Sequence, residues 1–180
     1  ILFGQPTGSI TIQKQNKQNY IKSKNIAIDI GNSSQNYTIK NSDIISTTND
    51  GINGGKATNL TIQNCEINSS NANGIYITKI NNNLSITDLN ITDSKYENIY
   101  IGVVGKLYIY DSILENGTYG IYLKNGYNGG EIKNNIIKNQ SVKGLKLFNT
   151  QIWRGYQVKN NCFENGNNKN VLSRDRNGYF

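Results

Sequence analysis

The sequence contains no histidine and no methionine, one proline, one tryptophan and two cysteines. Structural metal sites are built most often from histidine and from cysteine pairs such as Cys-x-x-Cys. Cys65 and Cys162 form no such pair, so the composition predicts no resident metal. No apolar run is long enough to cross a bilayer, so we expect no membrane insertion.

Basic residues outnumber acidic residues and give a formal charge of +7, but they form no cluster. The lysines are scattered, and the arginines are limited to Arg154, Arg174 and Arg176. No motif that combines basic and aromatic side chains for nucleic-acid binding is present. We therefore expect a solvated, mildly basic surface and no nucleic-acid partner.

Two residue types dominate the composition: asparagine and isoleucine together make up about a third of the chain. Isoleucine favours the pleated strand, and asparagine tolerates the left-handed backbone of tight turns. Over 180 residues, this combination predicts one domain of many short strands joined by tight corners.

A unit of about 23 residues repeats from Asn25 onward. One apolar column stands two positions before an Asn or Asp corner and contains Ile39, Ile62, Ile86, Ile109, Ile132 and Val158. A second column stands three positions after each corner, at Ile44, Ile67, Ile91, Leu114, Ile137 and Phe163. A third column contains Ile26, Ile52, Ile75, Ile99, Ile121, Leu145 and Val171. Strands repeating in step at this period predict a coil whose rungs stack as parallel sheets.

In these columns the chain resembles the right-handed parallel β-helix proteins of the pectate-lyase-like group, over about residues 25–175. The resemblance implies an all-β fold, a single-stranded right-handed parallel β-helix (solenoid) of about seven rungs, in residues 25–180. Residues 1–24 fit the repeat poorly, with one strand expected at Ile10 and Ile12, and should form an N-terminal cap or irregular first rung. The scaffold carries lyases, hydrolases, epimerases, adhesins and viral spikes, so it implies no single activity.

The rung positions predict a core of aliphatic ladders, with Cys65 packed inward and too far from Cys162 for a disulfide. The corner column is expected to form a ladder of hydrogen-bonded side chains. Its members are Asn41, Asn64, Asp88, Asp111, Asn134 and Asn160. Asp88 and Asp111, on adjacent rungs, are either ordinary ladder members or a pair that binds a cation. No cofactor is predicted, except calcium if the chain is a lyase.

The most distinctive surface feature is an outward column on sheet one, made of Tyr76, Tyr100, Tyr122 and Lys146. In the resembled family this sheet lines a polysaccharide cleft, which makes the column a candidate glycan-binding site. A stack of tyrosines also stabilises neighbouring strands without any ligand. Both interpretations remain open at the level of sequence.

Acidic residues flank this column in the position just before the first strand, where Asp50, Asn73, Glu97, Tyr119, Lys143 and Lys169 are equivalent. Asp50 and Glu97 are expected two rungs apart, about 9.6 Å at the backbone. Inverting glycosidases need carboxyls about 6.5–9.5 Å apart, so these two residues are the alternative catalytic pair. Scattered surface charge is the competing interpretation.

An outward apolar column on sheet three contains Ile113, Ile136 and Cys162. Aligned apolar side chains on the outside predict a contact surface for another subunit or for a terminal segment. Trp153 and Arg154 lie nearby in a longer turn, and both are residue types favoured at interfaces.

These features predict an extracellular, cell-surface or virion module for structure or adhesion that binds carbohydrate. Eight Asn-x-Ser/Thr sites, which are acceptors for N-glycosylation, agree with such a location. The alternative is a small polysaccharide lyase or glycoside hydrolase acting on the same face, and the absence of a dense catalytic cluster favours the binding module. The missing initiator methionine predicts a processed product or part of a longer parent chain. The ends of a short coil expose unpaired strands, which predicts a homo-oligomer or flanking domains.

Overall fold

The computed structural model describes residues 9–13, 20–69, 71–148, 155–164 and 171–174, and these ranges contain strands and no helix. The strands are β1 (Ser9–Gln13), β2 (Tyr20–Ser23), β3 (Ile28–Asp29), β4 (Asn36–Ser46), β5 (Ile52–Asn53), β6 (Lys56–Ala57), β7 (Asn59–Ser69), β8 (Ile75–Thr92), β9 (Glu97–Tyr110), β10 (Ile113–Glu115), β11 (Tyr119–Gly126), β12 (Gly130–Lys133), β13 (Ile136–Lys138), β14 (Lys143–Phe148), β15 (Tyr156–Lys159), β16 (Cys162–Glu164) and β17 (Val171–Arg174). The predicted all-β parallel solenoid is confirmed.

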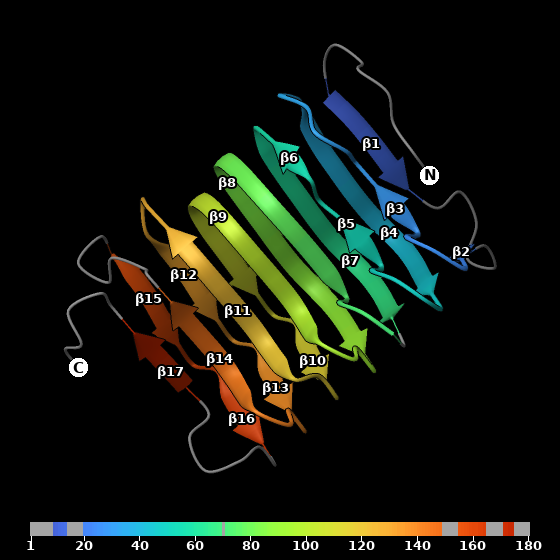
Figure 1. Cartoon of the computed structure of the whole chain (residues 1–180). Coiled ribbons are helices and arrows are strands. Elements are labelled where there is room, and N and C mark those ends of the chain that lie inside the picture. Colours follow the sequence, from blue (N-terminus) through green and yellow to red (C-terminus); the bar gives the residue numbers. More distant parts are fainter. Residues whose placement is uncertain (1–8, 14–19, 70, 149–154, 165–170, 175–180) are drawn as a thin grey trace.

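The strands form a coil of stacked rungs, with β1 near one end and β17 near the other (Figure 1). Sheet one contains β3, β5, β11, β14, β17 and the first parts of β8 and β9. Sheet two contains β1, β12, β15, the first parts of β4 and β7, and later parts of β8 and β9. Sheet three contains β2, β10, β13, β16 and the last parts of β4, β7 and β8. In the described ranges each sheet has seven segments, which corresponds to about six turns between the first rung and the last.

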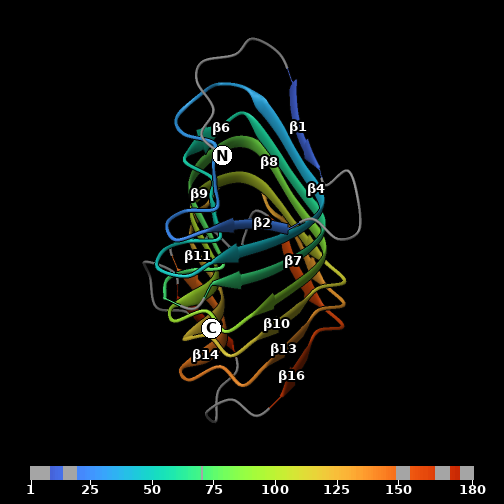
Figure 2. The same ribbon diagram turned by 90° about the vertical axis from the view of Figure 1, so that its right-hand side faces the viewer.

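Strands β4, β7, β8 and β9 each continue from one sheet into another, so the chain bends around the coil without leaving the ladder (Figure 2). The pairings of the described strands are parallel, and each rung lies on the next in register apart from one shift between β8 and β9. Because parallel strands lie about 4.8 Å apart, one apolar residue per rung gives a continuous ladder along the axis.

The predicted register of the core columns of sheets two and three is confirmed, and so is their burial except at the last rung, where Val158 is 39% exposed and Phe163 is half-buried. Ile39 pairs with Ile62, which pairs with Ile86, and the column continues to Val158. In sheet three Ile44 pairs with Ile67 in the same way, up to Phe163. The interior isoleucines are fully buried, and each contributes about 1.5–3 kcal/mol of hydrophobic stabilisation.

The first member of the sheet-one column was predicted wrongly. Ile28, and not Ile26, pairs with Ile52, and its backbone N–H donates to the Gly51 carbonyl at 3.1 Å. Ile26, Ile28 and Ile30 stand at alternate positions, so a shift of two residues again places an isoleucine on the inner face. Periodicity alone therefore does not distinguish the two registers.

Every member of the corner column has a left-handed backbone. The φ angles of Asn41, Asn64, Asp88, Asp111, Asn134 and Asn160 lie between 49° and 58°. The predicted side-chain ladder is confirmed for two pairs, since Asn64 Nδ2 donates to Asn41 Oδ1 at 2.9 Å and Asn134 Nδ2 donates to Asp111 Oδ1 at 3.0 Å. Asn or Asp is thus needed at the corner mainly for the backbone conformation, because other non-glycine residues adopt it only at a cost in free energy.

A second polar ladder lies one position after the corner and is buried. The Ser112 N–H donates to Asn135 Oδ1 at 3.0 Å, and the Asn135 N–H donates to Asn161 Oδ1 at 3.0 Å. Cys65 occupies the same column, is 4% exposed and donates to the Gln63 carbonyl at 3.2 Å, which confirms that it packs inward. Both cysteines are free.

Two glycines at the edge of sheet one are required for close packing. A Cβ at Gly74 would lie 2.5 Å from Ile91 Cγ2 and 2.7 Å from the Asn98 carbonyl oxygen. At Gly120 the corresponding contact, to Ile137 Cγ2, would be 2.4 Å. Sheets one and three therefore approach each other more closely at this edge than a side chain allows.

The first rung is built partly from the segment expected to cap the coil. Strands β1 and β2 both pair with β4, with Ile12 opposite Ile39 and Ile21 opposite Ile44. Strand β1 includes the predicted strand at Ile10 and Ile12. The cap role and the boundary at residue 24 stay predictions.

Replacing one corner residue will separate backbone conformation from side-chain hydrogen bonding. We expect Asn64→Ala to lower the free energy of unfolding by about 1–2 kcal/mol, because alanine is strained at positive φ. Asn64→Gly should cost less than half as much, since it accepts the conformation but also loses the bond to Asn41. Urea denaturation of the three proteins measures both differences. Equal losses in the two variants would instead assign the stabilisation to the side-chain ladder.

Candidate functional site

The outward face of sheet one carries the tyrosine stripe, which we define as Tyr76, Tyr100 and Tyr122 with Lys146 at its end. The predicted alignment of these residues is confirmed, because Tyr76 pairs with Tyr100, Tyr100 with Tyr122, and Tyr122 with Lys146. All four are half-buried. Alternation along the strands places them outside while their isoleucine and leucine neighbours fill the core.

The rings of the stripe contact one another closely. The Tyr76 and Tyr100 rings are stacked, with centroids 4.9 Å apart and an interplanar angle of 8°. The Tyr100 and Tyr122 rings meet edge to face at 5.3 Å and 82°. Lys146 Nζ lies 4.2 Å from the Tyr122 centroid and 4.8 Å from that of Tyr119. Ring faces inside the stripe are therefore covered by neighbours.

One ring face at the end of the stripe is not covered by another ring. The residue that pairs with Tyr76 on its other side is Asn53, a short side chain whose Oδ1 accepts the Gly55 N–H at 3.1 Å. The next residue of the column is Asp29. The column therefore steps down from a large ring to short polar groups, which leaves a ledge where a flat apolar surface can rest on the outer face of Tyr76. A sugar ring offers such a surface together with hydroxyl groups.

The residues that flank the stripe form a hydrogen-bonded ladder. Asp50 Oδ1 accepts from the Asn73 backbone N–H at 3.0 Å and from Asn73 Nδ2 at 2.9 Å. Asn73 Oδ1 in turn accepts from the Glu97 N–H at 3.1 Å. Glu97 pairs with Tyr119, which pairs with Lys143. The predicted equivalence of these positions is confirmed, except for Lys169, which lies outside the described residues.

Burial raises the pKa of both carboxyls of this ladder. For Asp50, which is 8% exposed, desolvation raises the pKa and the two hydrogen bonds from Asn73 oppose the rise. For Glu97, desolvation raises the pKa, its own backbone hydrogen bond and the charge of Lys146 lower it, and the charge of Asp50 raises it. Raised carboxyl pKa values are typical of general acids but also of buried structural ladders.

The predicted catalytic residues Asp50 and Glu97 lie on either side of one intervening rung, and the asparagine on that rung forms hydrogen bonds with both. Asn73 lies on the rung between them and bonds to the Asp50 carboxylate and to the Glu97 backbone. The Asp50 carboxylate is therefore held by the rung next to it instead of pointing free into solvent. A catalytic role of this pair stays a prediction.

The predicted cation pair lies at an exposed corner. Asp88 and Asp111 are both exposed, and Asp111 already accepts a hydrogen bond from Asn134. In the part of the chain that the structure describes, no three His, Cys, Asp or Glu side chains come together in a way that would hold a metal ion. Cation binding by this pair stays a prediction.

The apolar column on sheet three is in register, as predicted. Ile113 pairs with Ile136 and Ile136 with Cys162, and the two isoleucines are 38% and 39% exposed. Trp153 and Arg154 lie outside the described residues. The interface role of this column stays a prediction.

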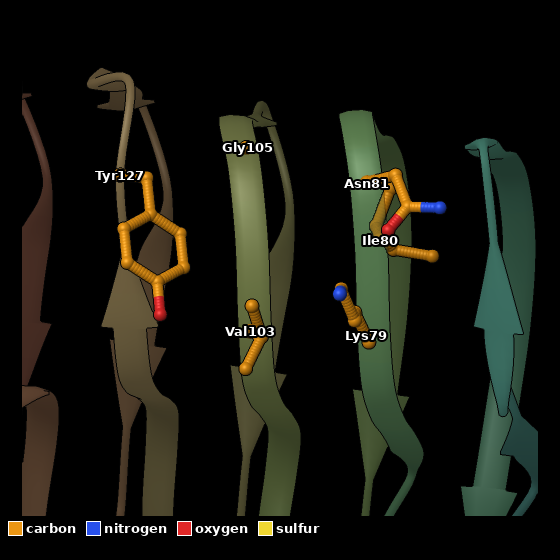
Figure 3. A pocket seen from close by; sticks show the side chains of 6 residues that line it. All are labelled: Lys79, Ile80, Asn81, Val103, Gly105 and Tyr127. Carbon is orange, nitrogen blue, oxygen red and sulfur yellow. The ribbon is translucent and has the colours of Figure 1, made fainter.

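A groove at the bend between sheets one and two was missed by the sequence reasoning. One hollow of about 400 Å³ is lined by Lys79, Ile80, Asn81, Val103, Gly105 and Tyr127 (Figure 3). A second hollow of about 460 Å³ is lined by Asn32, Ser33, Ser34, Lys56, Lys79 and Asn81. Both hollows are lined by Lys79 and Asn81, so they lie next to each other, and together they are called the lysine groove below. The signal in the sequence was Lys56 and Lys79 at equivalent repeat positions.

Comparison with known proteins identifies the scaffold. A family model described as "Right handed beta helix region" matches residues 26–179. Searches of curated proteins and of solved structures found no significant match. The described ranges also hold no helix of the length and apolar character needed to cross a membrane.

The raised pKa of Asp50 predicts a pH dependence of stability. A raised pKa means that the folded chain binds this proton more tightly, so the associated stability is complete below the unfolded pKa and is lost as the pH rises through the folded pKa. Asp50→Asn keeps an acceptor for Asn73 and removes this titration. We therefore expect urea denaturation between about pH 3 and pH 7 to show that the free energy of unfolding of the variant increases relative to that of the wild type as the pH rises. Asp88→Asn, which removes a carboxylate at an exposed corner, is the control for the loss of one negative charge. A constant difference between Asp50→Asn and wild type would contradict the assignment.

Proposed function

We propose that this chain, which belongs to the right-handed β-helix family, is a surface module that binds carbohydrate along the tyrosine stripe. The observation that carries the proposal is the step in the outward column of sheet one, where the Tyr76 ring borders the short Asn53 side chain. A pyranose ring placed on this ledge packs its C–H face against Tyr76. Its hydroxyl groups then lie beside Asn53 and the Asp29 carboxylate.

The chemistry of the ledge supports a sugar over a purely apolar ligand. Asn53 Oδ1 and Asp29 Oδ1 are occupied by the N–H groups of Gly55 and Gly31, whereas no hydrogen bond of Asn53 Nδ2 or Asp29 Oδ2 is found among the described residues. A donor and an acceptor are therefore available beside one aromatic face. Sugar recognition needs this combination of a ring face and polar groups of both kinds.

The stacked rings give the ledge a rigid support. Tyr100 lies directly behind Tyr76 at 4.9 Å and is itself contacted by Tyr122, so the orientation of the Tyr76 ring is fixed before a ligand arrives. Preorganisation of this kind reduces the entropy cost of binding. Stabilisation of the strands and binding of a ligand are thus two uses of the same column.

Binding to a glycan array tests the proposal. We expect the Tyr76→Ala/Tyr100→Ala double variant to lose at least about tenfold in affinity for the glycans that wild type binds, since it removes both the Tyr76 ring that contacts the sugar and the Tyr100 ring that supports it. Tyr108→Ala/Tyr110→Ala is the matched control, because these rings also contact each other, at 6.1 Å, but lie on the outer face of sheet two. Thermal unfolding of both double variants checks that the coil is intact. Binding that is unchanged in the first variant, or lost equally in both, would contradict the stripe as the site.

A second candidate function, favoured by the raised pKa values of Asp50 and Glu97, is a polysaccharide lyase or glycoside hydrolase acting on the same face. In this case one protonated carboxyl would serve as the general acid. Acidic and neutral polysaccharides, each with and without calcium, provide the screen for turnover. We expect none, in agreement with a binding module. Turnover that Glu97→Gln or Asp50→Asn reduces by about 10²-fold or more would instead establish the enzyme.

The proposed setting is extracellular, at a cell or virion surface, with roles in structure or adhesion. The eight Asn-x-Ser/Thr sites support this setting, and they make the chain a candidate glycoprotein. The exposed column of Ile113 and Ile136 supports association with a second copy or with other parts of a parent chain.

A further inference from the structure

The lysine groove lies where two strands change register and where a glycine leaves open the space that a side chain would fill. Strands β8 and β9 change register between Ile80 and Asn83, which is a bulge, and Gly105 lies opposite it. A Cβ at Gly105 would lie 2.4 Å from the Asn82 carbonyl oxygen and 2.5 Å from that of Asn81. Glycine is therefore required at this rung, and its lack of a side chain leaves the hollow open. Bulges often mark places where a fold presents side chains for function.

The backbone holds two exposed lysines side by side in the groove. Lys56 pairs with Lys79 on the next rung, and their backbone N–H groups donate to the Gly31 and Gly55 carbonyls at 2.9 Å each. Within the described ranges neither side-chain ammonium forms an ion pair or hydrogen bond, and no carboxylate lines either hollow. Like charges directly opposite each other on neighbouring strands are destabilising. An anion placed between the two ammonium groups relieves this repulsion.

The remaining lining residues include an aromatic and an apolar side chain, which are types that can pack against a sugar ring. Tyr127 is 48% exposed and stands across the hollow from Lys79 and Asn81, with Val103 between them (Figure 3). The Tyr127 backbone N–H donates to the Val104 carbonyl at 3.1 Å, which fixes the base of its side chain. The volume of about 400 Å³ lies within the range of small-molecule sites. One wall is thus aromatic, the floor apolar and the opposite wall cationic.

We propose that the lysine groove is a second saccharide site, selective for a sugar unit that carries a carboxylate or a sulfate group. The anionic group binds between Lys56 and Lys79, and the ring packs against Tyr127 and Val103. Asn81, shared by both hollows, lies beside the junction of the ring and the charged group. Ser33 and Ser34 extend the polar wall toward a neighbouring unit. This site is separate from the tyrosine stripe, because Lys79 lies three residues beyond Tyr76, about 10 Å along the strand.

Isothermal titration of the full chain with defined tetrasaccharides tests this site. The probes are a glucuronic acid tetrasaccharide, its methyl ester, a sulfated galactose tetrasaccharide, and inorganic sulfate alone. We expect one or both charged tetrasaccharides to bind at least about tenfold more tightly than the neutral ester, and the stronger of the two identifies the anionic group. Binding should weaken as salt rises, since exposed ion pairs are screened. Inorganic sulfate should bind more weakly than either, because it makes no ring contact.

Variants assign the binding to the groove. Lys56→Gln/Lys79→Gln removes both charges but keeps a polar side chain of two methylenes, and it should lose at least about tenfold in affinity for the charged tetrasaccharide. Lys159→Gln, at an exposed lysine of sheet two, removes charge elsewhere and should have little effect. Tyr127→Ala should weaken binding of the tetrasaccharide but not of inorganic sulfate. Equal affinity for the ester, equal losses in the two lysine variants, or sulfate binding as tight as that of the tetrasaccharide would overturn the proposal.

The two proposed saccharide sites can be contradicted independently of each other. Tyr76→Ala/Tyr100→Ala should leave the affinity of the groove for the charged tetrasaccharide within about threefold of wild type. If this variant abolishes all binding while the lysine variant does not, the stripe is the site and the groove is not. If the lysine variant alone abolishes binding, the groove stands and the proposed function of the stripe falls.

Discussion

The rung-to-rung hydrogen bond is the constraint on which the structure depends. The Ile28 N–H donates to Gly51, Ile52 to Gly74, and the Gly74 N–H donates to Glu97, each one turn further along the coil. Such bonds form only if every turn has nearly the same outline, so insertions are confined to bends. The bulge opposite Gly105 is one place where the outline changes without breaking the ladder. Each surface position is consequently repeated along the axis, and side chains form columns.

Most of the fold was predictable because sequence and structure share this periodicity. Isoleucine two residues before an Asn or Asp identifies sheet two directly, since the corner must be left-handed in every turn. Ile26 was misplaced because a shift of two residues preserves alternation and only the hydrogen bond to Gly51 decides the register. The need for glycine at position 74 was not predictable, because a close approach between two sheets leaves no trace in a linear pattern.

The candidate sites were predictable to different extents. Alternation along the strand was enough to place Tyr76 and Tyr100 outside and in register. Ring orientation was not predictable, and it decides that the interior faces of the stripe are covered while one end is open. The lysine groove was missed because the hollow results from the absence of a side chain at Gly105 and from the bulge beside it. Sequence reasoning finds side chains that are present more readily than the spaces between them.

The column arrangement gives the surface the properties of a one-dimensional lattice with a spacing of about 4.8 Å. A linear polymer lying along the axis makes identical contacts on each rung only if its own repeat is commensurate with this spacing. A polymer with another repeat falls out of phase after a few units, and further units then add no affinity. The length at which affinity stops rising is therefore set by the mismatch between two periods, and it is independent of the strength of any single contact.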